Sequence, residues 1–306
     1  MNMLSVILPA YNEEKMLGKS ASVISKILED AKIDYQLVFV NDGSKDNTWS
    51  EIEKAAAANK NIVGVNFSRN FGKESAMFAG LATATGDCVA VMDCDLQHPP
   101  EVLIEMYRLW EQGYEVVEAV KRSRGKESIF HKASAGLFYK LISSAVKIDM
   151  SRASDFKLMD RKCVETLLAM PEKNAFFRAL SSWIGYKSTS VEFDVQEREE
   201  GESKWSTWSL VKYAITNIVA FSSVPMQLVT IAGVCSFIFG IVMGVQTLIN
   251  FIMGKSVQGF TTVILLLLLM GSLIMISLGI IGYYISKIYE EVKGRPRYII
   301  SKVIGK

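Results

Sequence analysis

The chain has 306 residues, half of them hydrophobic, and its 34 basic and 32 acidic side chains leave a formal net charge of +2. This length allows one or two domains, and the charge balance gives no global positive field of the kind that attracts nucleic acid. The four cysteines form no CxxC pair, which favours reduced thiols facing a cytoplasm over a disulfide framework or a zinc site.

The first 200 residues alternate strand-like and helix-like segments. Strands separated by helices at this spacing predict right-handed crossovers, and so an α/β fold with a mostly parallel sheet. The segment 129–146 has an apolar stripe at helical spacing, which predicts an amphipathic helix rather than a spanning one. The expected strands are 4–8, 36–40, 62–67, 88–92 and 116–120, with helices to about Asp30, to about Asn59 and over 72–84.

Polar clusters follow the first four of these strands. The carboxyl ends of parallel strands meet at one edge of a sheet, so the clusters are expected to line one crevice, where open α/β sheets bind ligands. Neither a GxGxxG fingerprint nor a GxxxxGK[ST] loop occurs in the chain, which excludes a dinucleotide-binding or P-loop site of those types. The clusters are Pro9-Ala-Tyr11-Asn12-Glu13-Glu14, Asn41-Asp42-Gly43-Ser44, Ser68-Arg69-Asn70-Phe71-Gly72-Lys73 and Asp93-Cys94-Asp95-Leu96-Gln97.

Each cluster has side chains suited to a nucleotide. Two carboxylates two residues apart, Asp93 and Asp95, suit a hard divalent cation that also holds phosphate oxygens, although two solvated turn aspartates would give the same pattern. Carboxylates such as Asp42 and Glu13 can accept hydrogen bonds from a base or ribose. The cations Arg69 and Lys73 can offset phosphate charge. Any one cluster could be ordinary loop chemistry, but four together favour a nucleotide site.

Two long stretches near the C-terminus, 226–252 and 259–286, carry no Asp, Glu, Lys, Arg or His side chain. Each exceeds the ~20 residues that cross a hydrocarbon core of ~30 Å, which predicts two transmembrane helices. Six basic residues follow the second stretch, and basic flanks stay in the cytoplasm. Both termini are therefore expected inside the cell, with a short outer loop between the spans.

A tryptophan-rich segment precedes the first span. Apolar residues recur every three or four positions from Trp205 to Val219, which predicts a helix lying in the membrane interface. A helix packed on the soluble domain is the alternative. In either case the segment would hold the preceding domain against the bilayer.

The motifs as a set resemble the family-2 glycosyltransferases of GT-A fold. VILPAYNEE, VNDGS and the Asp-x-Asp strand end carry this likeness. FSRNFGKE, DCDLQHPPE, SDFKLMDR and GESKW, followed by two hydrophobic spans, are similar to the polyprenyl-phosphate subgroup, which contains dolichol-phosphate mannose synthases and bactoprenol glucosyltransferases. The resemblance covers essentially the whole chain, in order.

The resemblance implies four parts of the chain. They are a cytoplasmic GT-A domain over 1–204, an interfacial amphipathic helix over 205–223, two transmembrane helices over 224–286, and a basic cytoplasmic tail over 287–306. It also implies a multi-pass protein of the bacterial inner membrane. Its partners would be a nucleotide-sugar donor, a polyprenyl-phosphate acceptor and membrane lipids, with no nucleic acid. A homo-oligomer, a flippase and a downstream glycosyltransferase are candidate protein partners.

The resemblance also implies roles for single residues. Pro9, Tyr11, Glu13 and Asp42 would hold the nucleobase and ribose, with Arg69 and Lys73 toward the phosphates. Asp93, Asp95 and Gln97 would hold Mg²⁺ or Mn²⁺. Asp155 would sit beside the sugar and the acceptor phosphate; its alternative is a structural aspartate that caps a turn. Phosphates would be bound by Arg122, Arg124, Arg198, Ser203 and Lys204.

Two details weaken the assignments in the last loop. Relatives often carry a second arginine three residues before the position of Arg198, whereas this chain has Val195, so Arg122 would have to supply that contact. Basic residues beside a membrane, such as Arg198 and Lys204, can also merely meet anionic headgroups.

The expected reaction is transfer of one sugar, with glucose from UDP-glucose favoured, to undecaprenyl phosphate at the cytoplasmic face with inversion. A lipid phosphate is already anionic, so the site needs cations more than a strong general base. One alternative is a processive polysaccharide synthase, but the chain has no Gln-x-x-Arg-Trp motif. Another is a catalytically inactive, membrane-anchored binding protein or flippase partner, which the four intact clusters disfavour.

Overall fold

The computed structural model describes residues 2–122, 154–172, 176–194, 224–254 and 259–305. The chain forms two compact units: Met1–Ser209 together with Pro296–Lys306, and Leu210–Arg295. The amphipathic helices predicted over 129–146 and 205–223 lie outside the described residues.

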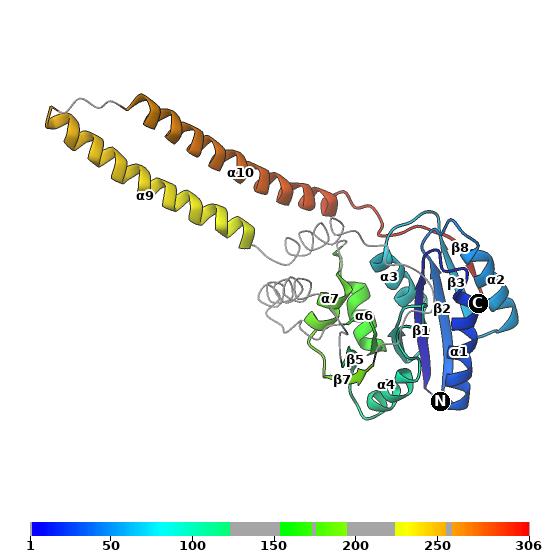
Figure 1. Ribbon diagram of the computed structural model, residues 1–306. Helices are drawn as coiled ribbons and strands as arrows, with labels where there is room; N and C mark the ends of the chain where they lie inside the picture. Colours follow the sequence, from blue (N-terminus) through cyan, green and yellow to red (C-terminus); the bar gives the residue numbers. More distant parts are fainter. Residues whose placement is uncertain (1, 123–153, 173–175, 195–223, 255–258, 306) are drawn as a thin grey trace. The chain divides into compact units, whose positions relative to one another are not determined.

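The first unit is built on one eight-stranded sheet in the order β7-β5-β6-β4-β1-β2-β3-β8 (Figure 1). Strands β4, β1, β2 and β3 are mutually parallel, and β5 is parallel to β7, whereas β6 and β8 run antiparallel to their neighbours. The predicted α/β fold with a mostly parallel sheet is confirmed. The strands are β1 (Met3–Ala10), β2 (Asp34–Asn41), β3 (Ile62–Phe67), β4 (Cys88–Val91), β5 (Val116–Lys121), β6 (Lys157–Asp160), β7 (Ser188–Phe193) and β8 (Ile300–Ile304).

Helices cover both faces of this sheet. The helices α1, α2 and α4 pack on one face, where Leu17, Ile24 and Leu28 of α1 repeat at helical spacing and are fully buried. On the other face α3 contacts β1 and β2, and α6 contacts α3. The approach of α3 is close: a Cβ on Gly80 would lie 2.2 Å from Ile7 Cγ2. The helices are α1 (Leu17–Asp30), α2 (Thr48–Ala58), α3 (Lys73–Thr83), α4 (Val102–Glu111), α6 (Arg161–Ala169) and α7 (Phe177–Trp183).

The last strand was not predicted from the sequence. Residues of β8, within the segment expected to be a basic tail, pair antiparallel with β3 and extend the sheet. Just before this strand, the Tyr298 ring stacks on Phe67 with centroids 5.2 Å apart, and the Ser68 N–H donates to the Ile299 carbonyl at 3.0 Å. The chain therefore returns to the first unit after the apolar helices.

The second unit contains two long helices in contact with each other, α9 (Val224–Ile252) and α10 (Phe260–Val292). The candidate spans Pro225–Ile252 and Leu266–Val292 have mean hydropathies of 2.4 and 2.2, and none of their most apolar stretch is buried in the protein. At ~1.5 Å per residue each is longer than a hydrocarbon core of ~30 Å. Both helices are thus long and apolar enough to cross a membrane, and α10 continues past the predicted end at Ser286.

Candidate active site

The ends of β1 and β2 are tied together by their polar loops. The Asn12 N–H donates to Ser44 Oγ at 2.9 Å, the Lys45 N–H donates to Asn12 Oδ1 at 2.9 Å, and the Glu13 N–H donates to Thr48 Oγ1 at 2.9 Å. Asn12 has a φ of 55°, in the left-handed region that asparagine tolerates better than most residues. Pro9 is the penultimate residue of β1, and Tyr11 and Glu13 are half-buried in the loop that follows this strand. The first two predicted clusters therefore lie together, as expected.

Asp42 fixes the loop that follows β3. Its carboxylate accepts hydrogen bonds from the Phe71 N–H at 2.6 Å and the Gly72 N–H at 2.9 Å. Burial raises the pKa of Asp42, and these two bonds act in the opposite direction. Gly43, with a φ of 63°, allows the loops to touch, because a Cβ there would lie 2.3 Å from the Arg69 carbonyl carbon. The predicted base or ribose contact of Asp42 would therefore involve a carboxylate that already has two backbone partners.

A cluster of two carboxylates and two cations lies beside these loops. The Lys73 ammonium is 2.6 Å from Asp93 Oδ1 and 3.2 Å from Asp155 Oδ2. Arg178 binds the same Asp155 carboxylate with two hydrogen bonds, Nε to Oδ1 at 2.6 Å and Nη2 to Oδ2 at 2.7 Å. Three predicted site residues thus meet, together with an arginine from α7. We call Lys73, Asp93, Asp155 and Arg178 the charge cluster.

Opposite charges dominate the electrostatics of this cluster. Burial alone would disfavour the ionised form of Asp155, but Lys73 and Arg178 outweigh it and hold the Asp155 pKa well below its usual range. The pKa of Asp93 is lowered in the same way, against burial and chiefly by Lys73. Asp155 therefore stays ionised at neutral pH. A carboxylate with so low a pKa is a poor general base, and it is suited to orienting a ligand.

Two further ionisable groups lie near the charge cluster: Glu74, which is half-buried, and Lys157, which is buried. Glu74 accepts a hydrogen bond from the Phe177 N–H at 2.9 Å, and burial, with the nearby charge of Asp155, raises the Glu74 pKa to about 7. Lys157 is fully buried, and its ammonium donates to Glu118 Oε1 at 2.8 Å and to Ser181 Oγ at 2.6 Å. These contacts connect α7, which carries Arg178, to α3, β5 and β6.

The Asp-x-Asp turn continues from the end of β4. Asp95 Oδ1 accepts a hydrogen bond from the Gln97 N–H at 3.1 Å, and Leu96 between them has a φ of 56°. A left-handed backbone is costly for leucine, and such strain is concentrated at functional sites. Among the described residues there is no group of three or more His, Cys, Asp or Glu side chains placed to hold a metal. A cation here would therefore depend on two carboxylates, the Gln97 amide, water and oxygens of a ligand.

The remaining predicted phosphate-binding residues make other contacts or lie outside the described residues. The Arg69 guanidinium stacks over the Phe71 ring, 4.4 Å from its centroid. Arg122, at the end of β5, pairs with Asp194 at 3.2 Å and Glu192 at 3.7 Å and is largely exposed. No contact of Arg122 to the charge cluster is seen in the described residues. Arg124, Arg198, Ser203 and Lys204 lie outside the described residues.

Sequence reasoning missed Arg178, Glu74 and Lys157. Arg178 is the one charge in the run Ala175 to Trp183, and a lone arginine in an apolar helical pattern is a signal that could have been followed. Glu74 and Lys157 belong to the FSRNFGKE and SDFKLMDR motifs, but the sequence does not indicate which members of a motif are buried.

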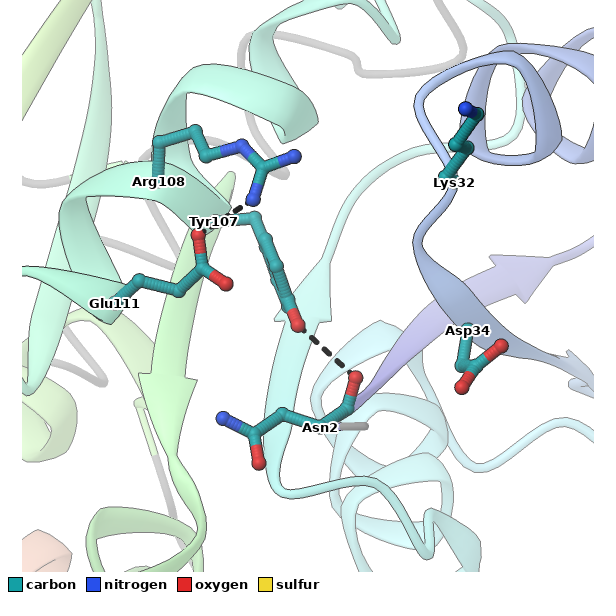
Figure 2. A pocket seen from close by; sticks show the side chains of 6 residues that line it. All are labelled: Asn2, Lys32, Asp34, Tyr107, Arg108 and Glu111. Carbon is teal, nitrogen blue, oxygen red and sulfur yellow. Dashed lines mark hydrogen bonds and ion pairs between the residues drawn. The ribbon is translucent and has the colours of Figure 1, made fainter.

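A cavity of about 330 Å³ lies at the opposite, amino edge of the sheet (Figure 2). It is lined by Asn2, Lys32, Asp34, Tyr107, Arg108 and Glu111. Its arginine is already paired, with Arg108 Nη1 2.6 Å from Glu111 Oε2. Two cations, Lys32 and Arg108, and two carboxylates, Asp34 and Glu111, line it, so the cavity has no excess of positive charge to bind a phosphate. This cavity and the charge cluster are therefore separate features.

Comparison with known proteins identifies the family. Residues 5–180 match the family described as glycosyl transferase family 2. The chain belongs to this family. An uncharacterised glycosyltransferase of Synechocystis sp. is 38% identical to this family-2 glycosyltransferase over 304 residues, which are 99% of this chain and 96% of the relative. The SfII prophage-derived bactoprenol glucosyl transferase of Shigella flexneri is 37% identical over 305 residues, 98% of this chain and 97% of the relative.

A solved structure supports the fold of the glycosyltransferase. The crystal structure of mannosyl-3-phosphoglycerate synthase from Rubrobacter xylanophilus matches with a TM-score of 0.50 and 18% identity, over 72% of this chain and 73% of that one. At this identity the likeness shows the fold alone. It confirms the predicted GT-A architecture, and the family match confirms that the chain is a glycosyltransferase.

Proposed function

We propose that this glycosyltransferase moves one sugar from a nucleotide-sugar donor to a polyprenyl phosphate, with glucose from UDP-glucose and undecaprenyl phosphate as the favoured pair. The observation that carries the proposal is the correspondence with a bactoprenol glucosyl transferase over 98% of this chain and 97% of the relative, which includes the two apolar helices. A lipid acceptor and helices able to cross a membrane belong together, because the acceptor phosphate lies at the membrane surface.

The donor diphosphate would be held with Mg²⁺ or Mn²⁺ at the Asp-x-Asp turn. Asp93, Asp95 and Gln97 offer hard oxygen ligands, and Mg²⁺ typically takes one or two carboxylates plus substrate phosphates. The residues present therefore fit such an ion. When bound, it would stabilise negative charge on the departing nucleoside diphosphate. The base and ribose would lie beside Pro9, near the end of β1, and beside Tyr11, Glu13 and Asp42 in the loops after β1 and β2.

The acceptor needs orientation more than deprotonation. A phosphate monoester of a lipid is anionic at neutral pH and can attack the anomeric carbon directly, so inversion follows from a single displacement. The low pKa of Asp155 agrees with this chemistry, because Asp155 would orient sugar hydroxyls or the acceptor rather than remove a proton. Lys73 and Arg178 place two positive charges where two anionic substrates would meet. Arg69, Arg122, Arg124, Arg198, Ser203 and Lys204 are the further candidates for phosphate contacts.

The return of the chain to the first unit supports a location with both termini in the cytoplasm. Strand β8 pairs with β3, although α9 and α10 lie between them in the sequence. If both helices cross the bilayer, the segments before α9 and after α10 must be on the same side. Basic residues flank the end of α10, which favours the cytoplasmic side of a bacterial inner membrane. The product would then need a flippase and a downstream glycosyltransferase as pathway partners.

The test is a transfer assay with the full-length protein in membranes. Undecaprenyl phosphate, Mg²⁺ or Mn²⁺ and a panel of radiolabelled nucleotide sugars are incubated together, and the lipid is extracted. The proposal predicts label in the lipid fraction from one donor, lost when the cation is chelated. Absence of labelled lipid with every donor would reject the proposed acceptor. Label in a growing polymer would indicate a processive synthase instead.

A further inference from the structure

Lys73 places a positive charge beside Asp93, the carboxylate that would also bind a metal ion. Its ammonium lies 2.6 Å from Asp93 Oδ1, and the same carboxylate would be a ligand of a divalent cation at the Asp-x-Asp turn. Two cations that share one carboxylate repel each other strongly. Lys73 and the metal therefore compete for Asp93.

The position of Lys73 on its helix is not explained by helix stability. Lys73 is the first residue of α3, directly after Gly72 with its φ of 97°. A cation at a helix N-terminus opposes the positive end of the helix dipole and is unfavourable there. The contacts with Asp93 and Asp155 offset that cost. Lys73 is therefore placed for the charge cluster.

Loss of the Lys73 charge would affect Asp93 more than Asp155. Asp155 receives both nitrogens of the Arg178 fork, at 2.6 and 2.7 Å, and keeps a cationic partner if Lys73 leaves. The side chains of Lys73 and Asp93 are 41% and 34% exposed, so a ligand can reach the pair. Lysine has a flexible four-carbon stem that can carry its ammonium between neighbouring anions.

We propose that Lys73 is an exchangeable counter-cation that couples metal binding to nucleotide binding. Without donor, its ammonium neutralises Asp93. With a nucleoside diphosphate bound, Asp93 would be among the residues that hold its metal ion, and the Lys73 ammonium moves from Asp93 to the diphosphate oxygens. This inference rests on the proposed function, because it requires a nucleoside diphosphate at this site. By linkage, each ligand then strengthens the binding of the other.

The experiment measures Mn²⁺ binding to the full-length protein in detergent by electron paramagnetic resonance of the free ion. Titrations are run without nucleotide, with UDP and with GDP. Without nucleotide the wild type should bind Mn²⁺ weakly. With one of the two nucleotides its affinity for Mn²⁺ should rise by about fivefold or more, which is the lower end of ordinary coupling between sites. Lys73→Met should bind Mn²⁺ alone about fivefold or more tightly than the wild type, and nucleotide should raise its Mn²⁺ affinity less than in the wild type, because only the direct contact between the diphosphate and the ion remains.

Three variants complete the design. Lys73→Arg keeps the charge and should retain weak binding of Mn²⁺ alone. Lys54→Met removes a lysine of α2 that pairs with Glu51 at 2.7 Å, and it should behave as the wild type. Lys73→Gln replaces Lys73→Met if circular dichroism shows that the methionine variant is misfolded.

Mn²⁺ affinity and nucleotide enhancement equal to the wild type in Lys73→Met and Lys73→Gln would overturn the inference. If the wild-type protein still transfers label to the lipid, that result leaves the proposed function intact. A wild type that binds no Mn²⁺ with either nucleotide would overturn the inference and the metal role together, whereas failure of lipid transfer alone would reject the acceptor.

Discussion

Arg178 and Asp155 form a bidentate ion pair, with Nε–Oδ1 and Nη2–Oδ2 distances of 2.6 and 2.7 Å. The guanidinium fork fixes the plane of the carboxylate as well as its charge. Arg178→Ala should therefore lower kcat of lipid glycosylation by about 10²-fold, the cost of misplacing a positioned group. Steady-state kinetics with nucleotide sugar and undecaprenyl phosphate would measure this.

A graded series separates positioning by Arg178 from a general structural role. Arg178→Lys keeps the charge without the fork and should recover only part of kcat. Arg108→Ala removes an exposed arginine of α4 that pairs with Glu111, so wild-type kinetics are expected. Equal kcat in the wild type and Arg178→Ala would show that the ion pair has no part in the reaction.

Asp155→Asn keeps the shape of the side chain and removes its charge. The neutral amide has one acceptor oxygen in place of two, so it cannot accept all three hydrogen bonds from Lys73 and Arg178, and the two cations lose their shared negative charge. We expect turnover to fall by about 10²-fold or more, again as the cost of lost positioning. Because we propose that Asp155 orients ligands and does not accept a proton, we expect the pH profile of the residual activity to keep its shape. A profile that loses its acidic limb would instead identify Asp155 as a proton acceptor.

Glu74 gives the stability of the first unit a defined pH dependence. Its pKa rises from 4.5 in a free side chain to about 7 in the folded protein. The folded state thus holds a proton that the unfolded chain releases, so this contribution is complete below pH 4.5 and is lost as pH rises through about 7. The pKa of buried His98 is lowered by burial, which gives the opposite sign.

A comparison with Glu74→Gln isolates the contribution of Glu74 from that of His98. Tm is followed by tryptophan fluorescence of the full-length protein in detergent. Between about pH 5 and 8 the Tm of the wild type should fall relative to that of the glutamine variant, by about 2–4 °C for each 1 kcal/mol. Parallel Tm curves for the two proteins would rule out a raised Glu74 pKa.

The pairing of β8 with β3 predicts the membrane topology. Cys235 is exposed on α9, so single cysteines would be introduced in a Cys235→Ser background. A membrane-impermeant maleimide added to intact spheroplasts should label Lys255→Cys, in the short loop between the spans, and should leave Lys302→Cys unlabelled until the cells are permeabilised. Labelling of Lys302→Cys from outside would contradict a cytoplasmic C-terminus.

The sequence predicted β1 to β4 because each is a short apolar run that ends in a polar turn. Their parallel pairing then brought Lys73 and Asp93 to one edge. Strand β6 was harder to predict, since it has four residues and begins with a lysine that tertiary contacts bury completely. Strand β8 pairs with a segment more than 200 residues earlier in the chain, and no local pattern in Ile300–Ile304 indicates such a partner.

The residues of the candidate site also divide into those that the sequence predicted and those that only tertiary packing brings together. Asp93 and Lys73 were predicted because their motifs end a strand or start a helix at the carboxyl edge, whereas Asp155 was predicted from the resemblance to the polyprenyl-phosphate glycosyltransferases. Arg178 reaches Asp155 only through the packing of α7, and the sequence gives no measure of that distance. Tertiary structure also determines the contacts of Asp42 and Arg122. Asp42 accepts hydrogen bonds from the backbone of the Phe71–Gly72 turn, and Arg122 pairs with two carboxylates of neighbouring β7 and the residue after it.

The most direct test of the account is the transfer assay with Asp95→Ala. Asp95 is a half-buried carboxylate on the turn after β4, and its loss should remove a proposed metal ligand without disturbing the sheet. We predict that the variant inserts into membranes, keeps the far-ultraviolet circular dichroism of the wild type, and transfers no radiolabelled sugar to undecaprenyl phosphate. Substantial transfer by the folded variant would contradict the proposed cation-dependent donor site.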